Sequence, residues 1–275
     1  MRSIAALIRR RPLVAYYVLT FGISWLVWSP MVIKPENTAI VTPVTMVGAF
    51  GPLLAALIGI RTREGRAGVR AWRAAIFRWR VPVAYYAATL LLPFALVFLG
   101  YGLFQLLGGA APEGWTPPPW FTYPILFLLV FFLGGGQEEP GWRGFALLRL
   151  EARFSPLVAS LILGVLWAFW HLPLFFVPAS SQSAAGFPFG AYLVGTTALA
   201  VIFTWQFHRT QGSVLLAMAL HAGLNAALNW VPILGTGGPV SLFVCIVAVE
   251  CLVAGALIVV GRLWTRAADQ PAPQG

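Results

Sequence analysis

The chain has 275 residues, of which 59% are hydrophobic and only 9% are charged. Soluble domains carry about 25% charged residues, so this composition excludes an ordinary soluble domain and predicts an integral membrane protein. The formal net charge of +10 could indicate a nucleic-acid-binding protein. However, the basic residues lie in short loops between apolar segments, where they indicate membrane topology. We therefore expect the lipid bilayer, and no nucleic acid, as a partner.

Eight apolar segments follow one another along the chain, each close to the 17–25 residues that cross a bilayer as a helix. The fourth contains Glu138, Glu139 and Arg143, but we treat it as one helix because an apolar pattern resumes at Phe145. We predict an all-α polytopic membrane protein, a bundle of eight transmembrane helices. The predicted segments are residues 13–33, 39–60, 82–108, 121–150, 157–178, 188–207, 212–233 and 239–264.

The distribution of arginine predicts the orientation of this bundle. With the N-terminus inside, the outside connections carry Lys34 and no other basic residue, so both termini are expected in the cytoplasm. Residues 1–12 would form a basic cytoplasmic N-terminus, 13–264 the transmembrane bundle and 265–275 a disordered cytoplasmic tail. The arginine-rich stretch 61–80 is either an amphipathic helix on the membrane surface or a solvated topology loop.

Several polar residues are expected at similar depth inside the bundle. Ionisable side chains are costly in hydrocarbon and usually mark a functional site. At a rise of 1.5 Å per residue, Glu138, His171, His221 and Asn225 lie roughly 14–24 Å from the cytoplasmic ends of their three helices. Three separate helices therefore bring an acid, two imidazoles and an amide to one level of the membrane.

Residues four apart project from the same side of a helix. Glu139 and Arg143 have this spacing, which predicts an ion pair and leaves Glu138 to face the histidines. His221 and Asn225 have it too. Taken singly, each feature also has a purely structural explanation. The ion pair could serve to lock helices together, and the histidines could be packing residues. Their joint occurrence favours a functional site.

Two chemistries suit this set. In the first, Glu138 is a general base that activates water with His171, while His221 and Asn225 donate hydrogen bonds to the oxyanion of a tetrahedral intermediate. In the second, Glu138, His171 and His221 bind zinc or another divalent metal, which activates the water. No His-Glu-x-x-His segment is present, so the sequence carries no independent metal signature.

These residues form three ordered motifs, namely Glu138-Glu139-x-x-x-Arg143, Trp167-x-x-x-His171 and His221-x-x-x-Asn225. Their order and spacing resemble the CPBP family of intramembrane proteases, also called Abi proteins. That family includes the type II CAAX prenyl endopeptidases and the bacteriocin-processing or self-immunity proteins. The resemblance covers about residues 120–230, the protease-like core of the predicted bundle. It departs from the family at Trp167, where phenylalanine is more frequent.

The resemblance implies an eight-helix bundle with a glutamate-dependent peptidase site inside the membrane. It assigns water activation to Glu138 and His171, and oxyanion binding to His221 and Asn225. Glu139, Arg143 and Trp167 would be supporting residues. The family is commonly labelled metalloprotease, and a metal-free glutamate mechanism is the competing view. The resemblance therefore does not decide between a zinc-dependent and a metal-free mechanism.

We expect a hydrolase of the CAAX prenyl protease type that cleaves a membrane-associated or prenylated protein or peptide. The content of Arg, Ala and Trp suggests a bacterial cell (inner or plasma) membrane. One alternative is a non-catalytic bacteriocin self-immunity or scaffold protein of the same fold. Another is a transporter that uses Glu138 and Glu250 as proton carriers, but it predicts internal symmetry that the sequence lacks. Glu250 itself has no evident partner in the sequence.

Overall fold

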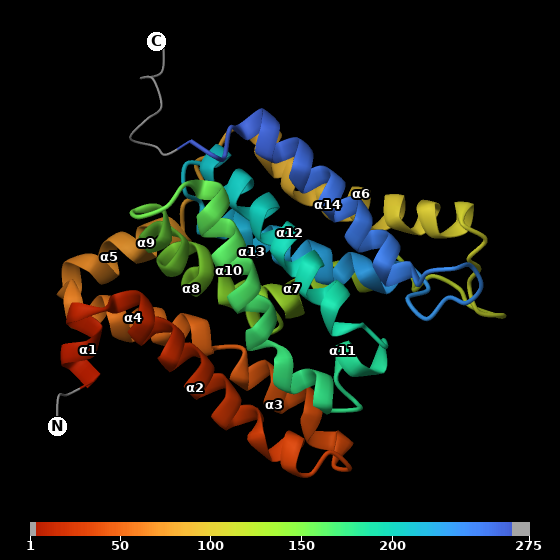
Figure 1. The fold of residues 1–275 in the computed structure, drawn as a ribbon, viewed down its shortest axis with the longest axis horizontal. Coiled ribbons are helices and arrows are strands. Elements are labelled where there is room, and N and C mark those ends of the chain that lie inside the picture. The colour runs from red at the N-terminus through yellow and green to blue at the C-terminus, as the bar shows by residue number, and fades with distance from the viewer. Residues whose placement is uncertain (1–3, 266–275) are drawn as a thin grey trace.

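The computed structural model describes residues 4–265. Over this range the chain is helical, with no strand and one isolated β-bridge between Ala110 and Thr236 (Figure 1). The α-helices are α1 (Ile4–Arg10), α2 (Pro12–Ile33), α3 (Val41–Gly48), α4 (Gly51–Arg63), α5 (Gly65–Ile76), α6 (Val83–Leu106), α7 (Thr122–Leu133), α8 (Glu139–Gly141), α9 (Leu148–Glu151), α10 (Pro156–Trp170), α11 (Ser181–Ala184), α12 (Phe189–Arg209), α13 (Val214–Ala227) and α14 (Leu242–Gly261). Short 3₁₀ turns are η1 (Thr38–Ile40), η2 (Gly136–Glu138), η4 (Leu172–Phe176) and η5 (Leu228–Trp230), and η3 (Trp142–Leu147) is π-helical.

Six helical stretches in the described part of the chain are long and apolar enough to cross a membrane. These are Pro12–Ile33, Thr38–Arg63, Val83–Leu106, Pro156–Phe176, Phe189–Arg209 and Leu242–Gly261. They confirm the prediction of an all-α membrane protein. The count of eight is not confirmed, because the helices in the fourth and seventh predicted segments are shorter than these six. The seventh is the apolar helix Val214–Trp230.

The fourth predicted segment is broken, which corrects the expectation of one helix over 121–150. Helix α7 ends at Leu133, and Gly135 then adopts a φ of +151°, a conformation that only glycine enters readily. Glycine also has a low helix propensity, so the consecutive glycines destabilise a helix here. Pro140 lacks the N–H that a continuous helix would need. The chain therefore passes through η2, α8 and the π-helical η3 before α9.

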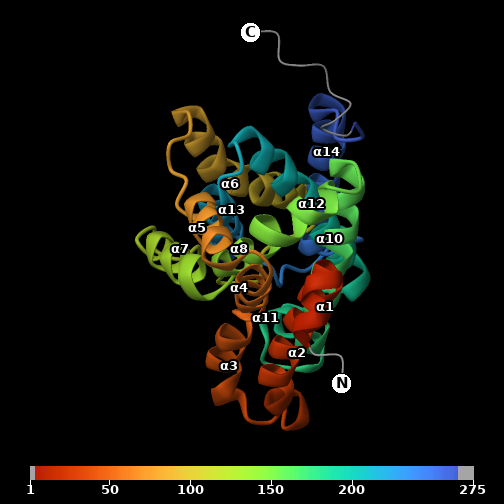
Figure 2. The same cartoon turned by 90° about the vertical axis from the view of Figure 1, so that its left-hand side faces the viewer.

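The interrupted segment is enclosed by other helices. Helix α12 packs against both α10 and α14, while α13 packs against α6 and α7. Helix α2 runs beside α3 and α4, and α4 contacts α8. Figures 1 and 2 show α8 inside this arrangement, between the α2–α4 group and the α12–α13 group. The residues around Glu139 are consequently buried.

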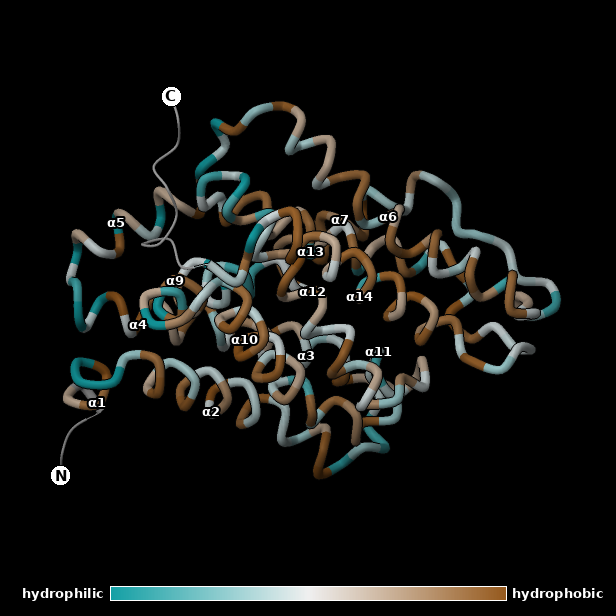
Figure 3. Tube along the Cα trace, turned by 45° about the horizontal axis from the view of Figure 1, so that its top comes forward, coloured by the Kyte–Doolittle hydropathy of each residue, from teal (hydrophilic) through white to brown (hydrophobic). Residues whose placement is uncertain are grey.

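The outer surface suits a lipid environment. Large apolar side chains are exposed on the long helices, among them Leu26, Val83, Leu106 and Leu252. Figure 3 shows hydrophilic residues gathered at one end of the molecule, on α1, α5 and α9. Large exposed apolar surface is unusual for a soluble monomer, whereas lipid tails can cover it.

The stretch 61–80 contains a helix, α5, which favours the amphipathic alternative. Val69, Trp72 and Ile76 face the protein, and the arginines of α5 are exposed. The Trp72 indole donates a hydrogen bond of 2.9 Å to the Pro140 carbonyl. Helix α5 is thus joined to the interrupted segment. The predicted disordered tail lies, except for Thr265, outside the described residues, as do residues 1–3 of the predicted N-terminal region.

Candidate active site

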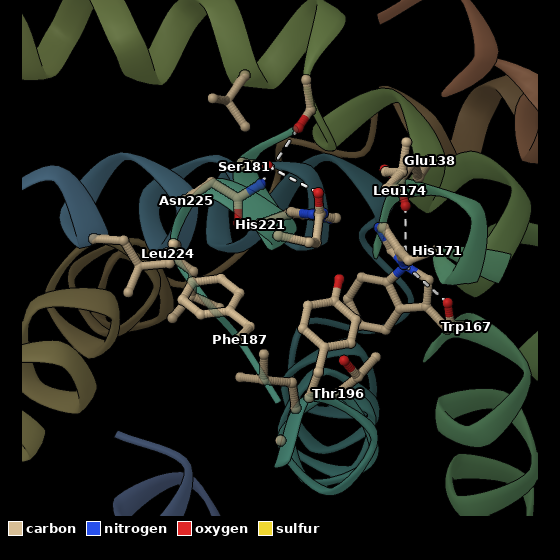
Figure 4. A pocket seen from close by; sticks show the side chains of 18 of the residues that line it. Glu138, Trp167, His171, Leu174, Ser181, Phe187, Thr196, His221, Leu224 and Asn225 are labelled. Atoms are coloured by element: carbon tan, nitrogen blue, oxygen red, sulfur yellow. Dashed lines mark hydrogen bonds between the residues drawn. The ribbon is translucent and has the colours of Figure 1, made fainter. Parts of the chain in front are cut away.

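The four predicted catalytic residues reach one cavity from three parts of the chain. Glu138 ends η2, His171 follows the last residue of α10, and His221 and Asn225 lie one turn apart on α13. All four line a cavity of about 430 Å³ (Figure 4). The break at Gly134 and Gly135 is what places Glu138 here, because it redirects the chain after α7.

The Glu138 carboxylate is held by two indoles. Its Oε2 atom accepts hydrogen bonds of 3.0 Å from Trp142 Nε1 and from Trp167 Nε1. Glu138 is 3% exposed, so these bonds replace most of the water that a carboxylate would otherwise bind. The other oxygen, Oε1, accepts no hydrogen bond from the described residues. One oxygen is therefore fixed and the other is available to a ligand.

His171 is oriented by the same tryptophan. Its Nδ1 lies 2.9 Å from the Trp167 carbonyl oxygen, and because a carbonyl only accepts, Nδ1 carries the proton. The Nε2 atom of a neutral ring is then a free acceptor. Trp167 therefore holds Glu138 through its indole and His171 through its backbone.

The predicted ion pair is present and has a further partner. Arg143 NH1 lies 2.9 Å from Glu139 Oε2, and both side chains are fully buried. His221 Nδ1 donates to Glu139 Oε1 over 2.8 Å. Glu138 shares the cavity with both histidines as expected, but the direct hydrogen bond of His221 goes to Glu139. Glu139 therefore orients His221, a role that the sequence pattern did not suggest.

Arg143 is also packed between aromatic rings. Its guanidinium carbon lies 4.7 Å from the Trp167 ring centroid and 4.3 Å from that of Phe203. Such cation–π contacts stabilise a buried guanidinium. They hold Arg143, and through it Glu139, in one position.

The Nε2 atom of His221 and the Nδ2 atom of Asn225 converge beside Gly135. A methyl group added at Gly135 would lie 2.5 Å from His221 Nε2 and 3.1 Å from Asn225 Nδ2. Asn225 Nδ2 also donates to the Gly134 carbonyl over 3.3 Å, which leaves its second N–H unused. The absence of a side chain at 135 thus keeps a small space open next to both nitrogen atoms.

Some residues that contribute to the candidate site were not predicted from the sequence. Trp142 lies four residues after Glu138, the spacing that also connects Glu139 to Arg143, so it could have been found. The contact of Trp72 with Pro140 joins residues 68 apart and has no local signal. Tyr192, whose ring lies 5.4 Å from that of His171, likewise comes from a distant helix.

The arrangement does not fit the predicted metal ligands. Within residues 4–265, no three His, Cys, Asp or Glu side chains are placed to hold a metal ion together. For Glu138, His171 and His221, the groups that fix each side chain are instead tryptophan indoles, a backbone carbonyl and Glu139. The side chains present are arranged for hydrogen bonding.

Comparison with known proteins agrees with the motifs. Residues 119–227 match the family model described as "Type II CAAX prenyl endopeptidase Rce1-like". This region is Rce1-like. The Rce1-like region contains all three motifs, from Glu138 to Asn225, and confirms the resemblance found in the sequence.

The chain is also 26% identical, over 228 residues, to the "CAAX prenyl protease 2" of Methanococcus maripaludis. That match covers 76% of this chain and 81% of the relative. Together with the six apolar helices, the Rce1-like region identifies an integral membrane protein.

Proposed function

We propose that this protein is an intramembrane endopeptidase that hydrolyses a peptide bond in a membrane-associated or prenylated protein. The observation that carries the proposal is the convergence of Glu138, His171, His221 and Asn225 on one cavity within a membrane bundle. The names of the family and of the archaeal relative support peptide hydrolysis. The relative's name also supports a prenylated substrate.

Glu138 and His171 activate the attacking water. Glu138 Oε1 accepts one proton of the water, and His171 Nε2 accepts a hydrogen bond from the other. The water oxygen then attacks the carbonyl carbon of the scissile bond and forms a tetrahedral intermediate. Glu138 passes its proton to the leaving nitrogen as the C–N bond breaks. The carboxylate is regenerated, so one water is consumed for each bond cleaved.

His221 and Asn225 stabilise the negative charge that develops on the carbonyl oxygen. The space beside Gly135 lies within hydrogen-bonding reach of both nitrogens, as an oxyanion site requires. Donation by His221 Nε2 requires protons on both ring nitrogens, since Nδ1 already donates to Glu139. Glu139 and Arg143 support this role, because a carboxylate beside the ring compensates the imidazolium charge.

The substrate is expected to approach from the bilayer. A cavity lined by apolar helices suits a peptide whose lipid tail or apolar helix rests in the membrane. We place the protein in a bacterial cell membrane, as its content of Arg, Ala and Trp suggests. Both termini are placed in the cytoplasm, as the arginine distribution favours.

Replacing Glu138 tests this function. In proteoliposomes, quenched fluorescent peptides would be supplied with and without a prenyl group, and cleavage would be followed by fluorescence and mass spectrometry. Glu138→Gln removes the base but keeps nearly the same shape. We expect it to lower kcat by about 10²- to 10⁴-fold, the usual contribution of a general base. Glu36→Gln, which removes an exposed carboxylate, is the matched control and should retain activity.

The same assay separates the enzyme from a non-catalytic immunity or scaffold protein. A scaffold would bind peptides without cleaving them, and Glu138→Gln would leave binding intact. Undiminished cleavage by correctly inserted Glu138→Gln protein would refute the proposed mechanism.

A further inference from the structure

The catalytic cavity contains a second carboxylate that the proposed mechanism does not use. On α14, Phe243, Ile246 and Glu250 are spaced three and four residues apart, so they share one face of the helix. All three line the cavity. Glu250 therefore belongs to the wall of the chamber that holds Glu138, and it extends that chamber toward α14.

Helix α12 makes room for this carboxylate. Tyr192, Gly195 and Thr196 form its cavity-facing side, and Figure 4 shows Thr196 across the cavity from His221. A methyl group at Gly195 would lie 3.0 Å from Glu250 Oε2. The neighbouring Tyr192 ring lies 5.4 Å from that of His171. One aromatic side chain thus connects the surroundings of Glu250 with the catalytic histidine.

Glu250 has no polar partner of its own. It is 6% exposed, yet within residues 4–265 its carboxylate accepts no hydrogen bond and forms no ion pair. A buried polar group without a hydrogen bond is costly. Carboxylates inside membranes usually pair with another charge or serve a functional site. A molecule that enters the cavity can supply the missing partner.

The charges around the cavity indicate what this partner is. Its lining includes two carboxylates, Glu138 and Glu250, and no lysine or arginine. The nearby Arg143 is already paired with Glu139. A hydrocarbon chain against Glu250 would cover the carboxylate without satisfying it. A lysine or arginine side chain supplies both the donors and the opposite charge.

We propose that Glu250 forms a specificity subsite for a lysine or arginine side chain of the peptide substrate. This inference rests on the proposed peptidase function and deepens it. The subsite lies in the same cavity as Glu138 and His171, so the basic residue is expected close to the scissile bond.

Peptides that differ at a single position test the subsite. In a quenched peptide series, lysine would be compared with norleucine and with acetyl-lysine, which keep the aliphatic chain and remove the charge. At one position of the peptide, we expect wild-type protein to cleave the lysine peptide with a kcat/KM about tenfold higher than that of the norleucine peptide. A hydrogen bond to a charged group contributes an effect of this size. Glu250→Gln should abolish this preference mainly through KM, so that the lysine and norleucine peptides are cleaved with equal kcat/KM.

Two further variants sharpen the result. Glu250→Lys should favour a glutamate-bearing peptide, whereas Glu113→Gln, at an exposed site, should keep the wild-type preference. Absence of any lysine preference in wild-type protein, or its survival in Glu250→Gln, would overturn the inference and leave Glu250 as a helix contact. Because the acetyl-lysine comparison uses wild-type protein, it stands even if a variant fails to fold.

Failure of the proposed function can be told apart from failure of the subsite. If no peptide is cleaved, the endopeptidase proposal fails. Fluorescence anisotropy of the same labelled peptides with the Glu138→Gln protein still measures the subsite. Tighter binding of lysine than of norleucine supports it, and equal binding refutes it.

Discussion

Trp167 has two hydrogen-bonding roles that a phenylalanine could not fill together. Its indole N–H binds Glu138 and its carbonyl oxygen binds His171. Phenylalanine, the more frequent residue of the motif, would keep the carbonyl contact and the ring beneath Arg143 but lose the bond to Glu138. In this chain, the orientation of Glu138, the proposed general base, therefore depends on a side-chain atom that the motif does not require.

Trp167→Phe is expected to lower kcat without unfolding the protein. A hydrogen bond to a charged group contributes about 1.5–3 kcal/mol, which corresponds to about 10- to 100-fold in rate. The measurement is kcat and KM in proteoliposomes, together with the thermal unfolding temperature. Trp205→Phe is the matched control, because the buried Trp205 Nε1 has no hydrogen-bond partner among the described residues. Equal losses in both variants would contradict the role of the Trp167 indole.

At the residue scale, much of the candidate site could be predicted from the sequence. The four-residue spacing of Glu139 and Arg143 predicted their ion pair, and that of His221 and Asn225 their common side. The link from His221 to Glu139 joins residues 82 apart and depends on how α13 packs. No local spacing encodes such a contact.

The interrupted segment between α7 and α9 is the element that creates the site. A continuous helix would have kept Gly135 in helical geometry, with no opening beside His221. Its glycines and Pro140 are visible in the sequence, but the apolar pattern that resumes at Phe145 outweighed them in the prediction of one helix. Apolar residues on both sides suggested continuity, since hydropathy alone does not distinguish one helix from two short ones joined by a break.

Gly135→Ala tests the importance of this break. The added methyl group would lie 2.5 Å from His221 Nε2, and alanine disfavours a φ of +151°. We expect at least about a tenfold loss of kcat, because a 1 Å misplacement near reacting groups can cost about 10²-fold, together with a lower unfolding temperature.

Gly102→Ala, within α6, is the control for Gly135→Ala. A methyl group there meets no atom within 4 Å, and alanine favours helix. Its activity should be unchanged and its unfolding temperature equal or higher. Full activity of Gly135→Ala would show that the space beside His221 is not used in catalysis.

At the scale of the whole molecule, the composition was the most informative property. A chain with few charges and long apolar runs has few folds available in lipid, because every backbone polar group must be satisfied internally. The all-helical fold was therefore predictable. The number of long helices was not, because α7 and α13 are too short by themselves, and packing within the bundle allows short helices to be stable.

Orientation in the membrane is testable as a property of the whole chain. Arginine-rich α1 and α5 lie at the same hydrophilic end (Figure 3), and the positive-inside rule places such residues in the cytoplasm. Reporter enzymes that are active on only one side of the membrane would be fused to either terminus in a bacterial host. Both fusions should report the cytoplasm. Opposite results for the two termini would require an odd number of crossings.

The hydrogen bond between Trp72 and Pro140 has a mechanical consequence. Pro140 directly follows Glu139 and lies two residues from Glu138, and its carbonyl is bound by the indole of an arginine-bearing helix. Helix α5 therefore cannot shift without either breaking this bond or pulling on the backbone beneath both glutamates. A displacement of the arginine-bearing helix α5 is in this way transmitted to the candidate active site.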